Sequence, residues 1–589
     1  MKGSNSSWLS RTYSRLTTPK RNHPVVDAVV AGYCGFVLFV QILLQISPVM
    51  TFLAKTPLYS IQTYLGLLGG ALIVVDLFTT KRIWQGKYSV LLYAILLLAA
   101  LASVRMISYG TKENLFKLCW MSVQFVLMYS CAYRMDRDTL RKYAKALFYV
   151  LLLIWFVGCC VSLYQYVNQI GYRYVVNPLA KDSSINRQGF YDNRLFGIFY
   201  TLNHAAYISL FFFIIAIVCM VREKHIWAKI GLGIAEFALL CHIVLSYSRS
   251  AMVSLIACAA VMPWFVARNM LKIRGALKPV ICCAVSIAVA VLCYFGYTGL
   301  KSGLVQVPYL KQLLVYNMQN KDDDTAQLPT KKPSTDSTNP SNSADLAPEE
   351  TLDATIDPSE EPTEATTATD ATTDPTTAPG TDASDPTAEP GVPPTKKPME
   401  KPTNNEDILS REYLEEDVSN DRFEIWADYI HLYKEVGLMG LSPGNYMPYI
   451  LENHADMYIV DYIKENYPSK YESGIIYHVH NGYMMVYVSA GIVGFLCLAL
   501  FILLYLIRLI AVILKNKKLS GLFIGAFALV VAGALSAIFD EGLFFQNNPH
   551  TTMFWLALGI LMREYHTKAD TVVEVDSQEE NPAEDATEA

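Results

Sequence analysis

Long apolar runs separated by short polar connections make up most of the sequence. A run of about 20 apolar residues can cross a bilayer as a helix, since only a helix satisfies its own backbone hydrogen bonds in hydrocarbon. We therefore predict an all-α fold, a polytopic membrane protein with about 12 transmembrane helices. The expected spans are residues 25–46, 57–78, 88–107, 114–133, 143–167, 200–221, 226–245, 250–267, 277–298, 482–509, 520–538 and 549–563.

Basic residues in the short connections indicate the orientation, because Lys and Arg are retained on the cytoplasmic side. The N-terminal segment 1–24 carries five of them, and every even-numbered connection is basic, beginning with Lys81 and Arg82. Both termini, including the acidic tail 564–589, are therefore expected in the cytoplasm. This orientation places a large loop, 299–481, outside the cell between the ninth and tenth helices. The transmembrane regions are then 25–298, with nine helices, and 482–563, with three.

The expected external loop has two parts of different composition. Residues 321–405 are rich in Thr, Pro, Asp and Glu and have almost no large apolar side chain, so they are expected to be disordered. Residues 408–481 are expected to be ordered and helical. Within them four large apolar side chains recur at helical spacing, which predicts that they form the apolar face of an amphipathic helix: Phe423, Trp426, Ile430 and Tyr433.

Composition and charge narrow the class of protein. Of the 589 residues, 52% are hydrophobic and 17% are charged, whereas soluble domains carry about 25% charged residues. The net charge of -5 hides two acidic appendages, residues 333–395 with 14 Asp or Glu and residues 567–589 with eight. Without them 47 basic and 31 acidic residues remain, an excess of 16 positive charges. This composition excludes an ordinary soluble enzyme, and the charge distribution indicates a basic membrane protein. Its expected partners include a lipid bilayer and no nucleic acid.

A polar cluster opens the eighth predicted span, where Arg249 lies among the hydroxyl groups of Ser246, Ser248 and Ser250. Arg249 is expected at the external edge of the membrane, and two interpretations remain open. It is either an interfacial arginine that extends its head group to water, or part of a site for phosphate oxygens. Guanidinium and hydroxyl groups together suit the second role.

His480 lies where the external loop enters the tenth span, at a depth where burying a polar cluster is costly. Histidine accepts a proton near neutral pH, so His480 is a candidate general base. A metal site with His478 is the alternative, but no Cys or carboxylate follows at the usual spacing, and we expect none. Arg194 precedes the sixth span and Asn203 lies at its start, and both are expected at the same membrane edge.

Four motifs follow one another between about 190 and 495. They are Arg194-x-x-Gly197 with Asn203, Ser248-Arg-Ser-Ala251, Arg422-x-x-x-Trp426 with Pro443-Gly-Asn445, and His480-Asn481 with Gly491-x-x-Gly494. In this order they resemble the O-antigen ligase and polymerase superfamily of integral-membrane glycan transferases. The resemblance covers roughly half of the chain, with the low-complexity tract as an insertion.

The resemblance implies transfer of a polyprenyl-pyrophosphate-linked oligo- or polysaccharide to an acceptor hydroxyl at the outer face of the cytoplasmic membrane. It implies inversion at the anomeric carbon, with no metal or other cofactor. Arg249 and Arg422 would hold the pyrophosphate, with help from Arg194, and stabilise its charge as it leaves. His480 would take the proton of the acceptor hydroxyl. The implied substrate-binding residues also include Asn203, Ser248, Ser250 and Asn481.

The Thr/Pro insertion is not part of the family pattern and resembles stalk sequences of Gram-positive surface proteins. It therefore favours a polymerase, or a ligase with a glycan, cell-wall or protein acceptor, in a Gram-positive bacterium. Two other classes remain open: a transporter or flippase for lipid-linked glycan, and a surface-exposed scaffold. A transporter typically has ionisable residues near the bilayer midplane, and here Asp27, Asp76 and Glu236 are the main candidates.

Overall fold

The computed structural model divides the chain into two units, residues 1–312 with 403–589, and residues 313–402. Of the second unit only 313–319, the end of one helix, is described. The expected disordered tract, most of the N-terminal segment, His478 and the acidic tail lie outside the described residues. The structure describes residues 23–86, 88–175, 185–191, 193–271, 273, 277–319, 422–466, 468–472, 479–516 and 518–563.

Nine helices among the described residues are long and apolar enough to cross a membrane. Their outward faces carry large apolar side chains, and Phe36, Leu67, Leu153 and Leu503 are each more than half exposed. Such surfaces are unfavourable in water and suit the hydrocarbon of a bilayer. The prediction of a mostly helical protein with membrane-spanning character is confirmed at this level. The nine are α2 (Pro24–Leu44), α4 (Ile61–Phe78), α7 (Arg137–Val167), α8 (Leu202–Arg222), α9 (Ile226–Ser246), α10 (Arg249–Met270), α11 (Leu277–Gln319), α17 (Gly482–Lys515) and α18 (Gly521–Phe539).

Three further apolar runs that the sequence predicts as spans also form helices. α5 (Ser89–Arg105) has 17 residues, and α6 (Lys112–Ser122) continues into the π-helical stretch Val123–Met128. A last helix covers residues 549–563. The short helices are α3 (Ser47–Ala54), α12 (Arg422–His431), α13 (Tyr433–Val436), α14 (Tyr446–Asn453), α15 (Tyr458–Asn466) and α16 (Pro468–Glu472), with 3-10 turns at Pro57–Ser60, Arg82–Gln85, Ile107–Tyr109 and Cys131–Arg134.

α11 is 43 residues long and passes the position where the expected external loop begins. It continues beyond residue 298 to Gln319, with Pro308 inside the helix. The apolar run marks where a helix can lie in hydrocarbon, whereas helical hydrogen bonds are internal and do not need an apolar surface. The helix therefore extends past the span that the sequence pattern predicts.

A small antiparallel sheet, which the sequence pattern does not predict, lies between α7 and α8 along the chain. Its strands are β1 (Gly171–Val175), β2 (Ile185–Tyr191) and β3 (Arg194–Gly197), with β2 in the middle. Gly197 has a φ of 62°, and a Cβ there would lie 2.0 Å from Ser162 Oγ on α7. Glycine permits both the conformation and this close approach, so β3 packs directly on α7.

Two backbone hydrogen bonds hold the chain that leads into α8. Tyr200 N donates to Gln45 O at 2.7 Å, and Ser47 N donates to Ile198 O at 2.8 Å. They join the corner between α2 and α3 to the chain that leaves β3. The first turn of α8, which contains His204, is thereby held against a second element that is distant in sequence.

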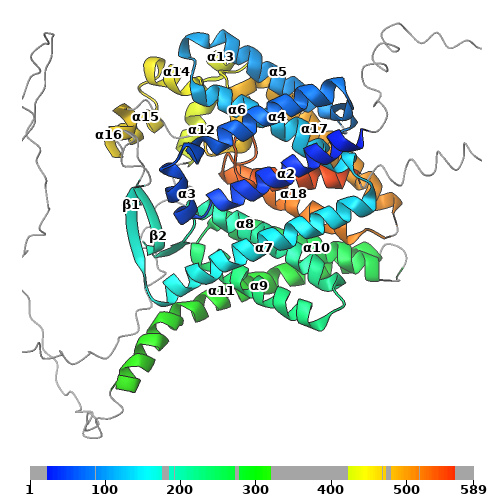
Figure 1. Ribbon diagram of the computed structural model, residues 1–589, viewed down its shortest axis with the longest axis vertical. Helices are drawn as coiled ribbons and strands as arrows, with labels where there is room; N and C mark the ends of the chain where they lie inside the picture. Colours follow the sequence, from blue (N-terminus) through cyan, green and yellow to red (C-terminus); the bar gives the residue numbers. More distant parts are fainter. Residues whose placement is uncertain are drawn as a thin grey trace, which may run out of the picture. The chain divides into compact units, whose positions relative to one another are not determined.

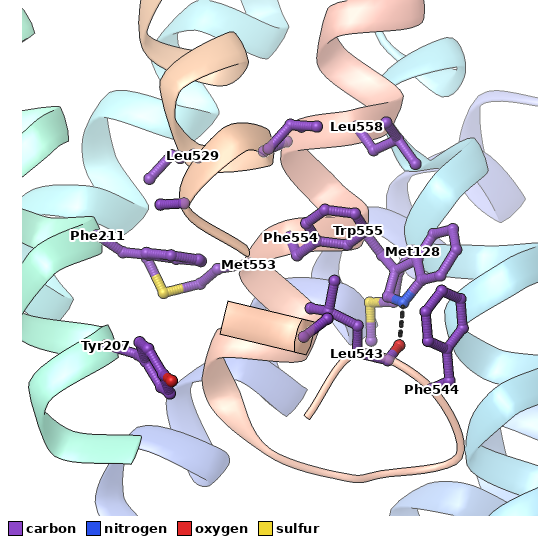
Figure 2. Close-up of a cluster of buried hydrophobic side chains, with 14 of the residues drawn as sticks. Met128, Tyr207, Phe211, Leu529, Leu543, Phe544, Met553, Phe554, Trp555 and Leu558 are labelled. Carbon is purple, nitrogen blue, oxygen red and sulfur yellow. Dashed lines mark hydrogen bonds between the residues drawn. The ribbon is translucent and has the colours of Figure 1, made fainter. Parts of the chain in front are cut away.

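The core lies between helices that are far apart along the chain. α8 packs on α9 and α18, α10 packs on α18, and α17 packs along α5 (Figure 1). Figure 2 shows Phe211 of α8 close to Met553 of the last helix, with Leu529 of α18 nearby. Trp555 Nε1 donates to Leu543 O at 3.0 Å. The connection that follows α18 is therefore part of the core.

α17 breaks at Gly491, where φ is 73° and ψ is -173°. Only glycine adopts this conformation at low cost. A Cβ at Gly491 would lie 2.3 Å from Leu438 O, and Leu441 N donates to Val488 O at 2.7 Å. The break thus lets the segment after α13 dock on the backbone of α17, which positions α12 as well.

The buried face of α12 differs from the predicted one. Ile425 and Tyr429 are 5% and 0% exposed, whereas Phe423 and Ile430 are 63% and 57% exposed. The predicted helix is present, and Trp426 of the predicted face does pack against the core, but the prediction is wrong for Phe423 and Ile430. Both pairs recur at helical spacing, so periodicity alone does not choose between them. Packing of Tyr429 against Tyr446, with ring centroids 6.0 Å apart, turns the helix to the observed face.

Candidate functional site

His480 precedes α17 in the left-handed region of backbone space, with a φ of 52°, which a non-glycine residue rarely adopts. Both sequence neighbours of His480 are held. Val479 O accepts a hydrogen bond from Trp426 Nε1 at 3.1 Å. Asn481 Oδ1 caps α17 by accepting from two backbone N–H groups, at 3.0 and 3.1 Å. A constrained turn therefore presents the imidazole.

Arg422 is the first residue of α12 and lies near His480. Its guanidinium acts electrostatically on His480 and on Tyr207 of α8. The hydrogen bond from Trp426 to Val479 anchors α12 one turn further on. Two candidate residues from different motifs are thus brought together by the docking of α12 on the start of α17.

The start of α10 meets the same group of residues through Ser250. Ser250 is a hydrogen-bonding partner of the Tyr207 side chain. Ser248 Oγ lies 3.3 Å from Ser250 Oγ, so the two hydroxyl groups are hydrogen-bonded. Ser248 is the N-cap residue of α10 and Arg249 is its first residue. The motif that contains Arg249 is therefore attached to Tyr207, on which Arg422 also acts.

Asp540 is a member of this group that the sequence pattern does not single out. It follows α18 as the C-cap residue, and its carbonyl accepts from Gly482 N at 3.1 Å. Its Oδ2 atom lies 3.8 Å from His204 Nε2, and its charge acts on His480. One carboxylate from the end of α18 thus stands near two histidines from different elements.

The side chains of His204, Tyr207 and His550 form a ring group beside Asp540. The ring centroids of His204 and His550 are 4.9 Å apart, and those of Tyr207 and His550 are 5.4 Å apart. His550 is fully buried, and a Cβ at Gly542 would lie 2.1 Å from its Nε2 atom. The absence of a side chain at Gly542 is what makes room for the His550 ring.

We call His480, Arg422, Ser250, Tyr207 and Asp540 the His480 cluster. Burial lowers the pKa of His480 below its ordinary value of 6.5; Asp540 acts to raise this pKa, and Arg422 acts to lower it. The imidazole is therefore neutral at pH 7 and able to accept a proton. Once protonated, it would be stabilised by the nearby carboxylate. The cluster combines a neutral base, a fixed cation and hydroxyl groups.

Glu541, the next residue, is buried as well. Burial raises the pKa of Glu541 to about 8; Lys117 acts against this rise, while Asp540 and Glu113 add to it. Lys117 is itself buried, pairs with Glu113 at 2.8 Å, and donates to Pro443 O at 3.3 Å. At neutral pH Glu541 is therefore mainly protonated, so the adjacent carboxyl groups of Asp540 and Glu541 have different surroundings.

Other predicted binding residues are placed differently. Arg194 opens β3, where its strand pairs with β2, and Asn203 lies in the first turn of α8 beside His204. None of the described contacts joins Arg194 or Asn203 to His480. Asn481 adjoins His480, but its side-chain oxygen is engaged in capping α17.

Some matched motif positions serve to dock the segment between α11 and α17. Gly444 N donates to Asn114 Oδ1 at 3.0 Å, and Asn445 Oδ1 accepts from Thr111 N at 3.0 Å. Gly444 approaches α6 so closely that a Cβ would lie 2.6 Å from Asn114 Cα. These residues and Gly491 therefore hold the segment that carries Arg422, and their place in the motifs has a structural explanation.

Within the part of the chain that the structure describes, no group of three His, Cys, Asp or Glu side chains is placed to hold a metal ion. All twelve cysteines are free thiols.

The sequence does contain a signal for the polar residues near His480 that the four motifs do not include. Asp540 and Glu541 form an acidic pair directly after the eleventh predicted span, and His204 directly follows Asn203. What the pattern lacks is their proximity to His480, because α8, α17 and α18 meet only in the folded chain.

Comparison with known proteins finds no family model, curated protein or solved structure that matches this chain.

Proposed function

We propose that the chain is a membrane glycosyltransferase that moves a polyprenyl-pyrophosphate-linked oligo- or polysaccharide onto an acceptor hydroxyl, as O-antigen ligases and polysaccharide polymerases do. The observation that supports this is the His480 cluster. Arg422, His480 and Ser250 belong to three separate motifs, and their contacts converge around Tyr207 and Asp540. A neutral base beside cations and hydroxyl groups suits proton removal next to a departing anion.

In the proposed reaction the acceptor oxygen attacks the anomeric carbon of the donor. The bond from that carbon to the pyrophosphate oxygen breaks, the configuration inverts, and the acceptor proton passes to His480. Arg249 and Arg422 hold the pyrophosphate and balance its charge as it leaves, with Ser248 and Ser250 as hydrogen-bond donors. No metal or other cofactor takes part in this scheme.

The remaining predicted residues are assigned to binding farther from the reacting carbon. Arg194 and Asn203 are proposed to hold the donor from β3 and α8, and Asn481 to keep the turn that carries His480. The acceptor is proposed to be a glycan, cell-wall component or protein. The acidic Thr/Pro tract supports a Gram-positive source, since it resembles surface stalks of such bacteria.

The proposed topology has twelve crossings with both termini in the cytoplasm of the cell. The nine long helices are joined by α5, by α6 with the π-helical stretch that follows, and by the helix over 549–563. This alternation would put His480, Arg422, Ser250, Asp540 and His204 at the same outer membrane edge. Their mutual contacts in the folded chain support that topology.

A transporter is the main alternative, and it would need ionisable side chains within the membrane that are able to carry a cation. Asp76 Oδ1 lies 2.7 Å from Arg134 Nη1, and Asp27 Oδ2 lies 3.1 Å from Arg82 Nε. Carboxylates paired in this way stabilise the packing of helices and are not available to carry a cation across the bilayer. The pairing of Asp27 and Asp76 favours the enzyme over the transporter, whereas Glu236, the third candidate, has a buried side-chain oxygen without a hydrogen-bond partner among the described residues. A surface scaffold would leave the His480 cluster without a role.

The decisive experiment is glycan transfer by the purified full-length protein, with a polyprenyl-pyrophosphate-linked oligosaccharide as donor. His480→Ala should lower the rate by about 100-fold or more, since a general base contributes about that much. His431→Ala, at an exposed histidine at the end of α12, is the matched control and should transfer at the wild-type rate. Normal turnover by a well-folded His480→Ala protein would remove His480 as the base.

Arg249→Lys tests the proposed pyrophosphate contact. Lysine keeps the charge but cannot form the two parallel hydrogen bonds of a guanidinium, so we expect transfer to fall. Full activity would favour the interpretation of Arg249 as an interfacial arginine.

Glycan analysis of a deletion strain distinguishes a polymerase from a ligase. Short unpolymerised units on the acceptor indicate a polymerase, whereas full-length glycan left on the lipid carrier indicates a ligase.

A further inference from the structure

A groove bordered by α7, α8 and the start of α18 has a cationic mouth. Arg141 and Lys145 of α7 and Arg222 of α8 line it, and its volume is about 260 Å³. Glu223 is the one carboxylate among the lining residues that the structure describes. Lys145 Nζ lies 3.6 Å from Glu223 Oε2. Arg141 Nη1 in turn lies 3.6 Å from Oδ1 of Asp138, a residue next to the groove but not among those that line it. The mouth therefore keeps one positive charge in excess after both pairs are counted.

Arg222 lies against the beginning of α18. A Cβ at Gly521 would come within 2.7 Å of Arg222 Nε, so the guanidinium touches the first residue of that helix. The C-terminus of α8 favours Arg222, but the N-terminus of α18 carries partial positive charge and attracts anions. The guanidinium of Arg222 and the N-terminus of α18 thus lie side by side at the groove. An anion bound between them would be stabilised by both.

Below the mouth the groove becomes apolar. Ala144, Phe148 and Ile215 line it and also line a second cavity of about 110 Å³. That cavity reaches Leu529 of α18 and Met553 of the last helix, which Figure 2 shows within the hydrophobic core. A charged entrance is therefore continuous with a wall made of hydrocarbon side chains.

We propose that this groove binds an anionic phospholipid. The phosphate lies among Arg141, Lys145 and Arg222, whose donors match its oxygens, and an acyl chain follows Ala144 and Phe148 inward. Basic pockets between transmembrane helices recognise anionic head groups in this way. A free phosphate would use the cations but not the apolar wall. The site shares no residue with the His480 cluster, so the proposal of a lipid site does not depend on the proposed transfer reaction.

The test is native mass spectrometry of the full-length protein titrated with phosphatidylglycerol or, as the neutral comparison, phosphatidylcholine. The wild-type protein should bind phosphatidylglycerol about tenfold more tightly or better. The paired change Lys145→Gln with Arg222→Gln should abolish this preference, since each surface cation contributes appreciably to anionic-lipid binding. Lys142→Gln with Lys515→Gln removes two exposed cations outside the groove and should leave the preference intact.

Two single changes separate the apolar wall from the charge. Ala144→Leu fills the junction of the two cavities without altering charge, and it should weaken phosphatidylglycerol binding severalfold. Glu223→Gln removes the one carboxylate among the described lining residues and should strengthen binding. Glycerol phosphate, which lacks acyl chains, should not compete. Equal affinity for both lipids, equal effects of the two paired changes, or unchanged binding by Ala144→Leu would each overturn the proposal.

Discussion

His480 adopts a backbone conformation that costs a non-glycine residue about 1–2 kcal/mol. The hydrogen bond from Trp426 to Val479 and the cap formed by Asn481 hold the turn in place. Residues kept in such conformations by their surroundings are concentrated at functional sites. Here the turn directs the chain so that His480 lies near both Asp540 and Arg422.

Asp540→Asn is expected to change the pH dependence of transfer. The carboxylate raises the pKa of His480 against burial and Arg422, so its loss should lower that pKa further and weaken the base. The acid limb of the pH–rate profile should move to lower pH, and the rate at neutral pH should fall about tenfold or more. The measurement is the rate of glycan transfer by purified protein between pH 5 and pH 9.

The control for this change is Asp461→Asn, at an exposed acid in α15. It removes the same charge away from the His480 cluster and should leave the profile unchanged. If Asp540→Asn reduces the rate but the acid limb stays in place, Asp540 does not act through the pKa of His480, contrary to this prediction.

Glu541→Gln is expected to alter stability in a defined pH window. The pKa of Glu541 is raised by burial from 4.5 to about 8, so between these values the folded chain binds a proton that the unfolded chain releases. Stability therefore falls as pH rises through the window. The glutamine variant does not titrate, and its thermal midpoint should exceed that of wild type by about 2–4 °C at pH 8. At pH 4, below the ordinary pKa of 4.5, the two should agree.

The measurement is thermal unfolding of the detergent-solubilised protein at several pH values, with Glu465→Gln at an exposed site of α15 as the control. The control should follow wild type throughout. A lower midpoint for Glu541→Gln at pH 8 would mean that Glu541 is ionised and stabilised by Lys117, contrary to this reading.

At the scale of elements, the break in α17 joins two parts of the candidate site. Its N-terminal end follows His480, and the open backbone at Gly491 receives the segment after α13. The turn at Gly444 fixes the same segment to α6. Arg422 is thus positioned by contacts that lie well away from its own side chain.

Gly491→Ala should disrupt this docking. The alanine Cβ would lie 2.3 Å from Leu438 O, and the backbone conformation at Gly491 strongly disfavours any residue other than glycine. We expect a loss of about 1–3 kcal/mol, seen as a lower thermal midpoint, and weaker transfer as Arg422 shifts. Gly233→Ala on α9 is the matched control, because open space surrounds that position and alanine favours helix. Equal stability of the two variants would contradict the docking role.

At the scale of the whole molecule, a buried ion-pair network joins α2, α4 and the turn before α7. Arg134 pairs with Asp76 through two hydrogen bonds, at 2.7 and 2.9 Å, and Arg82 pairs with Asp27 at 3.1 Å. Removing one partner of such a pair leaves a charge buried without compensation, which typically costs about 3–5 kcal/mol. The network therefore holds the first helices together at the end where Arg82 and Arg134 lie.

Twelve crossings predict the location of reporter fusions. A fluorescent protein fused after residue 566 should fluoresce in the cytoplasm, and alkaline phosphatase fused there should be inactive. Alkaline phosphatase inserted near residue 350 should be active, because that tract is expected outside the cell. A fusion after residue 86, following the second expected span, serves as a cytoplasmic control. The proposed topology has three crossings between residues 350 and 566, so the same side for both would mean an even number of crossings and would contradict the topology.

The expected spans and the order of the helices follow from the sequence alone, because the length of an apolar run is a local property. The position of His480 at the start of a helix could be read in the same way. The buried face of α12 could not, since Phe423 and Ile425 each belong to an apolar series at helical spacing. That choice is made by the elements on which α12 packs.

Some members of the His480 cluster could be found from the sequence, and others only from the folded structure. Sequence motifs marked His480, Arg422 and Ser250 as polar groups expected at one membrane edge. They could not mark Asp540 or Tyr207, whose importance lies in their contacts with residues of other helices. Those contacts arise when α8, α10, α17 and α18 pack together, and packing depends on the shapes of all their faces at once. Apolar runs specify which segments can enter a membrane, whereas tertiary contacts determine which side chains meet there.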